Sequence, residues 1–209
     1  MAYGFLDIAI TPSVKAAQEA MGSDRIWSDF KGHRDFDRFT ESEAAFIAAR
    51  DSFYLASVSE TGWPYVQHRG GPAGFLKVLD ARTLAFPDYR GNRQYISLGN
   101  VTADDRAALI LMDYAGRQRL KIYAHVAVLA IDADPALAAQ LAIPGYRAVP
   151  ERLFKLRLET FDWNCPQHIT PRFTEAEIAL AVTPLRDRIA TLEAENATLR
   201  AKLAARGDE

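Results

Sequence analysis

The chain has 209 residues, of which 49% are hydrophobic and 25% charged, as in ordinary globular domains. Its net charge of −2 gives no basis for binding nucleic acid or an anionic membrane, and no run of apolar residues is long enough to predict a membrane-spanning helix. The N-terminus lacks the pattern of a secretory signal, and the single cysteine, Cys165, excludes an intrachain disulfide framework. We therefore expect a cytoplasmic protein in which Cys165 is a buried, unreactive thiol.

Helix signals occur on both sides of a strand-rich centre. Thr11-Pro12-Ser13 begins a predicted helix that runs to about Met21 and ends at Gly22. Thr40 and Glu43 have the spacing of a capping box, which predicts a helix from there to about Asp51. Another short helix is predicted over Asp134–Leu141, with Pro135 in its first turn.

Most of the central chain has the short, alternating pattern of strands separated by turns. In the last of these segments Phe154, Leu156 and Leu158 alternate with charged residues. Closely spaced strands with few helices are typical of antiparallel barrels. We therefore predict a mainly β fold with flanking helices (α+β), built on a six-stranded antiparallel split barrel. Seven segments are strand-like, one more than the six strands predicted for the barrel: Phe53–Ser59, Pro64–Arg69, Phe75–Leu79, Thr83–Phe86, Arg106–Met112, Arg119–Ile131 and Leu153–Phe161.

The C-terminal segment has a different pattern, in which apolar residues recur alternately three and four residues apart. One asparagine interrupts this heptad seam, and such an asparagine favours a two-stranded parallel coiled coil. A helix packed on its own barrel is the alternative, because the seam is short and Pro184 lies near its start. The expected organisation is an N-terminal helical extension over 1–39, the barrel over 40–173 and this helix over 174–209. The seam residues are Val182, Leu185, Ile189, Leu192, Asn196, Leu199 and Leu203.

A possible anion site surrounds the hairpin formed by the third and fourth strand-like segments. The basic, glycine-rich corner His68-Arg69-Gly70-Gly71 precedes the hairpin, and Arg90-Gly91-Asn92-Arg93-Gln94 follows it and is predicted to open a short helix. Arginines, glycines and a helix N-terminus together favour binding of an anion, most naturally a phosphate.

The order of these elements resembles the FMN-binding split barrel of the pyridoxamine 5'-phosphate oxidase family, over about Glu41 to Arg172. The shared pattern is a strand with arginine, a strand with lysine, a tight turn, a strand ending in phenylalanine, and a polar-Arg-polar cluster. The resemblance implies that FMN is the cofactor and that Arg69, Lys77 and the cluster Asn92-Arg93-Gln94 hold its phosphate. Gln94 stands where the family usually has a lysine.

The same resemblance implies further cofactor contacts and a homodimer. The backbone of Phe86-Pro87-Asp88 would meet the flavin ring. The strand that carries Arg119 and Lys121 would reach the flavin from the partner subunit, which places the cofactor at the subunit interface; an ordinary basic strand start is an equal alternative. Trp163 and Arg172-Phe173 have the spacing of the family's C-terminal tryptophan and Arg-Phe pair near the flavin.

Two functions remain open from the sequence. The first is an FMN-dependent oxidoreductase that acts on a small-molecule substrate the sequence does not identify. The second is a protein on the same barrel that binds FMN, haem or a deazaflavin without turnover, with His68 or His168 as haem ligand. The family's oxidase grips its vitamin substrate with an Arg-x-His motif, whereas Gln167-His168 offers only the histidine, which argues against oxidation of pyridoxine phosphate. The histidines show no spacing typical of a metal site.

Overall fold

The computed structural model describes residues 4–28, 36–163 and 166–207. Cys165, for which burial is predicted, lies outside the described residues. The chain divides into two compact units, one of residues 1–113 with 117–169 and the other of residues 114–116 with 170–209.

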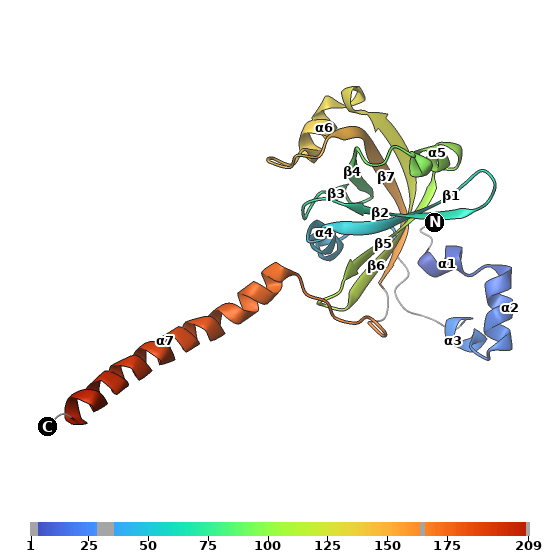
Figure 1. Cartoon of the computed structure of the whole chain (residues 1–209). Coiled ribbons are helices and arrows are strands. Elements are labelled where there is room, and N and C mark those ends of the chain that lie inside the picture. The colour runs from blue at the N-terminus through green and yellow to red at the C-terminus, as the bar shows by residue number, and fades with distance from the viewer. Residues whose placement is uncertain (1–3, 29–35, 164–165, 208–209) are drawn as a thin grey trace. The chain divides into compact units, whose positions relative to one another are not determined.

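Seven antiparallel strands form one continuous sheet in the first unit (Figure 1). Their order is β2-β1-β5-β6-β7-β4-β3, so that β2 and β3 are the two end strands. This confirms the mainly β, antiparallel fold with flanking helices, with seven strands in place of the expected six. The strands are β1 Ser52–Val58, β2 Pro64–Gly70, β3 Lys77–Asp80, β4 Thr83–Tyr89, β5 Arg106–Asp113, β6 Gln118–Ala130 and β7 Pro150–Trp163.

The helices agree with the sequence signals in most places. The predicted capping box is present at the start of α4, where the Glu43 carboxylate accepts hydrogen bonds from the Thr40 backbone N–H at 2.9 Å and from its hydroxyl at 2.5 Å. The first-unit helices are α1 Phe5–Ala9, α2 Pro12–Ala20, α3 Asp24–Ser28, α4 Glu41–Ala48, α5 Ile96–Ala103 and α6 Pro135–Leu141, with the 3₁₀ helix η1 Ile131–Ala133 before α6.

Two boundaries differ from the prediction because of local backbone conformation. The helix expected to open at Asn92–Gln94 begins only at Ile96, since Arg93 and Tyr95 have φ angles of 61° and 53° and cannot continue a right-handed helix. The strand expected from Phe75 begins at Lys77. A turn precedes it, in which Gly74 has a φ of 79°.

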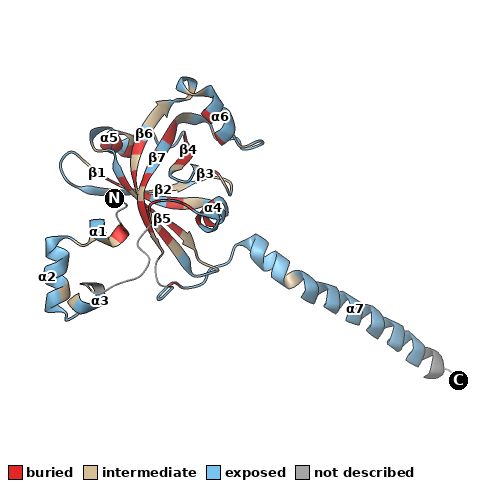
Figure 2. Cartoon of the chain, turned by 180° about the vertical axis from the view of Figure 1, so that it is seen from behind, coloured by how far each residue is buried: buried red, intermediate tan, exposed pale blue. Residues whose placement is uncertain are grey.

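The core lies between the inward faces of the strands (Figure 2). Phe86 on β4 and Phe154 on β7 are register partners, and their rings stack with centroids 5.1 Å apart. Phe53 on β1 meets Phe86 edge-on at the same distance. The opposite faces of β4 and β7 are covered by α6, where Ala85 and Leu153 lie in a second buried cluster. Both faces of β4 are therefore buried, and each of its core-facing side chains lies beside that of its register partner on β7.

The second unit is dominated by the helix α7, Glu175–Gly207. Thr174 caps it: its hydroxyl accepts a hydrogen bond from the Glu177 backbone N–H at 3.2 Å, and the Glu177 carboxylate accepts one from the Thr174 N–H at 2.7 Å. The side chains described along α7 are almost all exposed (Figure 2). Neither α7 nor any other helix in the described ranges is long and apolar enough to cross a membrane.

Candidate functional site

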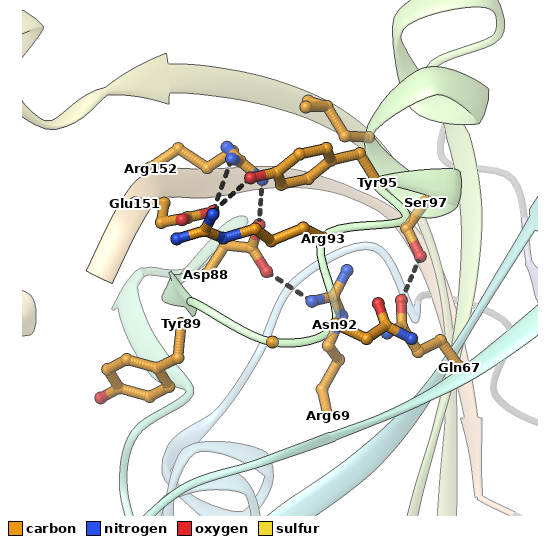
Figure 3. Close-up of a pocket in the computed structure, with 12 residues that line it drawn as sticks. Gln67, Arg69, Asp88, Tyr89, Asn92, Arg93, Tyr95, Ser97, Glu151 and Arg152 are labelled. Carbon is orange, nitrogen blue, oxygen red and sulfur yellow. Dashed lines mark hydrogen bonds and ion pairs between the residues drawn. The ribbon is translucent and has the colours of Figure 1, made fainter. Parts of the chain in front are cut away.

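A polar pocket lies where the C-terminal part of β2, the end of β4, the loop over residues 90–95 with the start of α5, and the start of β7 meet (Figure 3). Its volume is about 40 Å³. The charged and amide side chains that line it are Gln67, Arg69, Asp88, Asn92, Arg93, Glu151 and Arg152. The structure therefore brings together Arg69, Asn92 and Arg93, three of the residues predicted to hold a phosphate.

Strand alternation explains why these side chains converge. Phe86 points into the core, so Asp88, two residues further along β4, lies on the same face. Arg152 is the register partner of Asp88 on β7, just as Phe154 is the partner of Phe86. On β2, Arg69 is paired in register with the buried Phe53 of β1. The inward face of the barrel thus continues from apolar into charged residues at this end.

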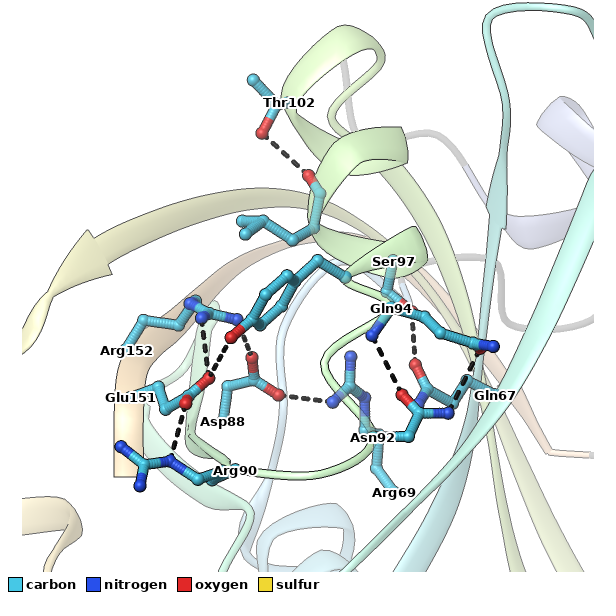
Figure 4. A network of polar contacts seen from close by, with 12 residues as sticks. Gln67, Arg69, Asp88, Arg90, Asn92, Gln94, Ser97, Thr102, Glu151 and Arg152 are labelled. Carbon is cyan, nitrogen blue, oxygen red and sulfur yellow. Dashed lines mark hydrogen bonds and ion pairs between the residues drawn. The ribbon is translucent and has the colours of Figure 1, made fainter. Parts of the chain in front are cut away.

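Asp88 is the centre of a buried ion-pair cluster (Figure 4). It is 5% exposed and accepts hydrogen bonds from Nη1 of Arg69 and, at 2.7 Å, from Nη1 of Arg152. The two arginine side chains are 14% and 16% exposed. In such a setting a charge is tolerated only when it is paired, so the three groups depend on one another.

A second carboxylate, that of Glu151, lies beside this cluster. It accepts hydrogen bonds from Arg90 Nε at 2.9 Å, from Arg152 Nη2 at 2.9 Å and from the Tyr95 hydroxyl at 3.2 Å. The hydrogen bond from Arg90 lowers the pKa of the Glu151 carboxyl, and the hydrogen bond from Tyr95 and the positive charges of Arg152 and Arg90 act in the same direction. The Arg152 guanidinium also lies over the Tyr95 ring, 4.7 Å from its centroid.

The pocket carries more positive than negative charge. Three arginines line the pocket, Arg69, Arg93 and Arg152, against the two carboxylates of Asp88 and Glu151. Arg90, which pairs with Glu151 from beside the pocket, is a fourth arginine of this charge cluster, so the cluster as a whole holds two positive charges in excess. Within the described ranges, the buried Arg69 Nε has no hydrogen-bond partner. The Arg93 guanidinium likewise takes part in none of the ion pairs of the described residues. These features suit a doubly charged anion.

The loop that carries Arg93 is held in an uncommon conformation. Arg93 and Tyr95 both lie in the left-handed region, and each such non-glycine residue costs roughly 1–3 kcal/mol. The Asn92 side chain accepts a hydrogen bond from the Gln94 N–H at 3.1 Å and donates one to the Gln94 side chain at 3.2 Å. Backbone strain of this kind persists where the surroundings determine it and is common at binding sites. Gln94 itself contacts Asn92 and does not line the pocket.

Three other predicted cofactor contacts lie on β3 and β4, away from the pocket. Lys77 is the register partner of Ala85, so it lies on the face of the sheet opposite to Asp88 and Arg69. The Phe86 side chain is fully enclosed in the core. Pro87 faces the α6 side and lines an apolar cavity of about 210 Å³. Their predicted roles toward a cofactor stay predictions.

The residues predicted to reach the flavin from a partner subunit, Arg119 and Lys121, and those predicted to lie near it, Trp163 and Arg172, have structural contacts of their own. Lys121 pairs with Asp162 at 2.8 Å and lies over the Phe5 ring, 4.5 Å from its centroid. The Trp163 indole donates a hydrogen bond to Glu43 at 2.8 Å. Arg119 is paired with Met112 across β5 and β6, and Arg172 lies in the second unit over the Tyr114 ring.

Sequence reasoning missed several residues of the pocket, chiefly Arg152, Glu151 and Tyr95. A signal for Arg152 was present, because it continues the alternation of Phe154 and Leu156 by one step toward the N-terminus. A charged residue on an otherwise apolar face marks the end of the core or a buried site. Tyr95 and Glu151 gave no such signal, because their contacts come from the loop conformation.

Residues 39–160, more than half of the chain, match the family model of pyridoxamine 5'-phosphate oxidase. The chain belongs to the pyridoxamine 5'-phosphate oxidase family. This confirms the resemblance predicted from the sequence, and the pocket lies within the matched region. No curated protein gave a significant sequence match.

Three solved structures similar to this member of the pyridoxamine 5'-phosphate oxidase family are distant from it in sequence. HupZ from Group A Streptococcus is 14% identical, covering 65% of this chain and 99% of that one with a TM-score of 0.50. HutZ, the haem storage protein of Vibrio cholerae, is 15% identical over 60% and 94%, with a TM-score of 0.41. An FMN-binding protein from Syntrophomonas wolfei is 11% identical over 73% and 95%, with a TM-score of 0.40. The HupZ comparison shows a shared fold, and the other two are too distant to support a conclusion.

Proposed function

We propose that this member of the pyridoxamine 5'-phosphate oxidase family binds FMN, with the phosphate in the arginine-rich pocket, and acts as an FMN-dependent oxidoreductase. The observation that carries the proposal is the charge at the pocket: with Arg90 beside it counted, two positive charges are unbalanced, and the buried Arg69 Nε is unpaired among the described residues. A phosphate monoester carries about −1.5 to −2 charges at neutral pH. It would balance this charge and accept the hydrogen bond of the Arg69 Nε–H, for which the described residues provide no acceptor.

Arg69, Asn92, Arg93 and Arg152 are the residues that would hold the phosphate. Charged hydrogen bonds from arginine to phosphate oxygens are roughly twice as strong as neutral ones. The N-terminus of α5 follows directly after the loop and would add a favourable dipole. The strained loop conformation would keep Asn92 and Arg93 in place before the ligand arrives.

The pocket is too small to hold the whole cofactor. Its volume of about 40 Å³ compares with roughly 300–1,000 Å³ for pockets that enclose a complete ligand of this size. The flavin ring would therefore lie outside it, against a surface that one chain does not complete. A homodimer with the cofactor at the subunit interface would supply that surface through the strand that carries Arg119 and Lys121. Trp163 and Arg172 are predicted to lie near the flavin.

When bound, FMN would supply hydride transfer, and the protein would supply binding, orientation and electrostatics. The substrate is a small molecule whose identity neither the sequence nor the pocket specifies. The alternative is a protein that binds FMN, a deazaflavin or haem on the same barrel without turnover. A deazaflavin also carries a phosphate, so the pocket alone does not separate it from FMN.

The first test is the absorption spectrum of the purified protein, followed by mass analysis of any released chromophore. A flavin spectrum with the mass of FMN, bleached by a reduced nicotinamide, supports the oxidoreductase. Flavin that no donor bleaches supports the non-catalytic alternative, and a haem spectrum overturns the cofactor. Titration with riboflavin, which lacks the phosphate, should give much weaker binding than FMN. Equal affinities would contradict a phosphate in the pocket.

Arg93→Ala tests the pocket itself. It should weaken FMN binding by roughly 2–4 kcal/mol, or between about 30-fold and 1,000-fold, because one phosphate charge would lose its partner. Riboflavin binding should not change. Arg117→Ala is the matched control, since Arg117 is also an exposed arginine with a positive φ of 52° but does not line the pocket. Unchanged FMN affinity in Arg93→Ala would remove Arg93 from the site.

A further inference from the structure

The helix α7 carries an exposed apolar seam that suits a second helix. Its leucines and isoleucine are 45–67% exposed: Leu185, Ile189, Leu192, Leu199 and Leu203. We propose that the α7 helices of two copies of this chain form a parallel, in-register, two-stranded coiled coil over Val182–Leu203. The proposal concerns α7 alone and is independent of the cofactor proposed for the barrel.

The residues of the seam favour two parallel strands. In heptad notation the a positions are Val182, Ile189, Asn196 and Leu203, and every d position is leucine. Branched residues at a with leucine at d favour parallel dimers over larger bundles. In a parallel pair in register, the two copies of Asn196 face each other and their amides can bond together. In any other alignment each amide faces an apolar side chain and loses that partner.

The charged residues beside the seam give independent support. In a parallel coil each g residue lies close to the e residue of the next heptad in the partner helix. Arg188 at g is therefore set against the second copy's Glu193, and Glu195 at g against the second copy's Arg200. Both complete pairs join opposite charges, and the two-fold symmetry of the dimer repeats each of them.

A shift of one helix by a single heptad reverses this complementarity. The pairs then become Arg188 with Arg200, Arg188 with Arg186, Glu195 with Glu193 and Lys202 with Arg200. All four pairs join like charges, so repulsion disfavours the shifted register, whereas attraction favours the helices in register.

The antiparallel alignment is disfavoured as well. When a and d positions of antiparallel helices are matched along the seam, Asn196 faces Leu192, and residues at g pair with g and those at e with e. The resulting pairs are Arg186 with Arg200, Arg188 with Lys202, and Glu193 and Glu195 each with its own copy. Every one joins like charges. Among these arrangements only the parallel pair in register satisfies both the asparagine and the charges.

Disulfide trapping in the full-length chain tests this arrangement. Cys165→Ser removes the native thiol, and a single new cysteine is then placed at a d position by Leu192→Cys. The matched control is Ala194→Cys, two residues away at an f position on the outer face of the helix. With glutathione disulfide as oxidant, we expect the Leu192→Cys chain to form interchain dimers roughly tenfold faster than the control, because identical d positions face each other only in a parallel coil in register.

The rate measured on non-reducing gels decides the matter. Equal rates for the two variants, or a faster rate for Ala194→Cys, would overturn the proposal. A helix α7 that packs on its own barrel would give such a result. Neither substitution touches the pocket, so FMN binding should be the same in both. A failure of coiled-coil formation is thus distinguishable from a failure of the cofactor proposal.

Charge exchange provides a second test that does not depend on oxidation. A chain with E193R and E195R has only arginines at the four pairing positions, and a chain with R188E and R200E has only glutamates there. When both are co-expressed with different tags, we expect mixed dimers to exceed the half that random pairing gives, because only the mixed coil joins opposite charges. A mixed fraction of one half would show that α7 does not choose the partner and would overturn the proposal.

Discussion

Replacing Asp88 with asparagine separates the two roles of charge in the pocket. The buried carboxylate of Asp88 pairs with both Arg69 and Arg152, and all three side chains are at least four-fifths buried. The asparagine keeps the size and one acceptor oxygen but removes the negative charge. It therefore tests whether this carboxylate stabilises the fold at the expense of anion binding.

The size of the effect follows from the burial of the arginines. Breaking a buried ion pair by removing one partner costs about 3–5 kcal/mol, and the remaining amide oxygen reduces that to about 3 kcal/mol here. In a protein of this size each kcal/mol corresponds to roughly 2–4 °C in Tm, so we expect a fall of about 6–12 °C without ligand. FMN should in contrast bind roughly tenfold more tightly, because the phosphate no longer competes with a carboxylate for the two arginines.

Thermal unfolding with and without FMN, together with a flavin fluorescence titration, measures both effects. Asp104→Asn is the matched control, since Asp104 also pairs with an arginine but in an exposed position, where such a pair contributes little. A Tm equal to that of the parent would refute the claim that Asp88 holds the buried arginines. Weaker FMN binding would refute the competition and show that Asp88 is needed to position them for the ligand.

Two further predictions concern Glu43 and Asn196, which lie outside the pocket. Burial raises the pKa of Glu43, but the hydrogen bonds from Thr40 and Trp163 outweigh it, so the pKa lies below the usual 4.5. The stability that the ionised Glu43 provides is present above about pH 4.5 and is lost as the pH falls through its lowered pKa. Glu43→Gln should therefore make the decline of Tm in acid shallower than in the parent protein. An identical dependence of Tm on pH in the two proteins would contradict this prediction. Asn196→Leu should raise the helix content that survives heating, measured by circular dichroism, and should allow coils of more than two strands, measured by light scattering. A less stable variant that remains strictly dimeric would argue against Asn196 in the seam.

The fold was accessible from the sequence because its strands alternate clearly. The buried face of β7 can be written down from Phe154, Leu156 and Leu158 alone, and the capping box at Thr40 placed α4 correctly. The predicted start of α5 was wrong because the residue types of Arg93 and Tyr95 do not reveal their left-handed backbone conformation. That conformation depends on the loop's contacts with β2 and β7. Local signals predict elements well and the geometry between elements poorly.

The site was predictable only in part for the same reason. Arg69, Asn92 and Arg93 come from one stretch of chain whose pattern is recognisable, and they do lie together. The other half of the charge cluster, Arg152 and Glu151, comes from β7, some 60 residues later, and is joined to the first half by sheet register. Lys77 lies on the opposite face of the sheet from Arg69, because β3 pairs it with Ala85, and its role toward a phosphate stays a prediction.

The composition of the cluster favours a ligand over a purely structural role. Buried ion pairs contribute little net stability, and well-packed apolar residues of the same size often do better. A cluster kept for structure alone would at least be neutral, whereas this one holds two positive charges more than its carboxylates balance, with a buried Arg69 nitrogen unpaired among the described residues. Asp88 holds Arg69 and Arg152 in position in the absence of a ligand without cancelling their combined charge. Such an arrangement costs stability, and a phosphate would recover that cost on binding, because it supplies the missing negative charge where the arginines already point.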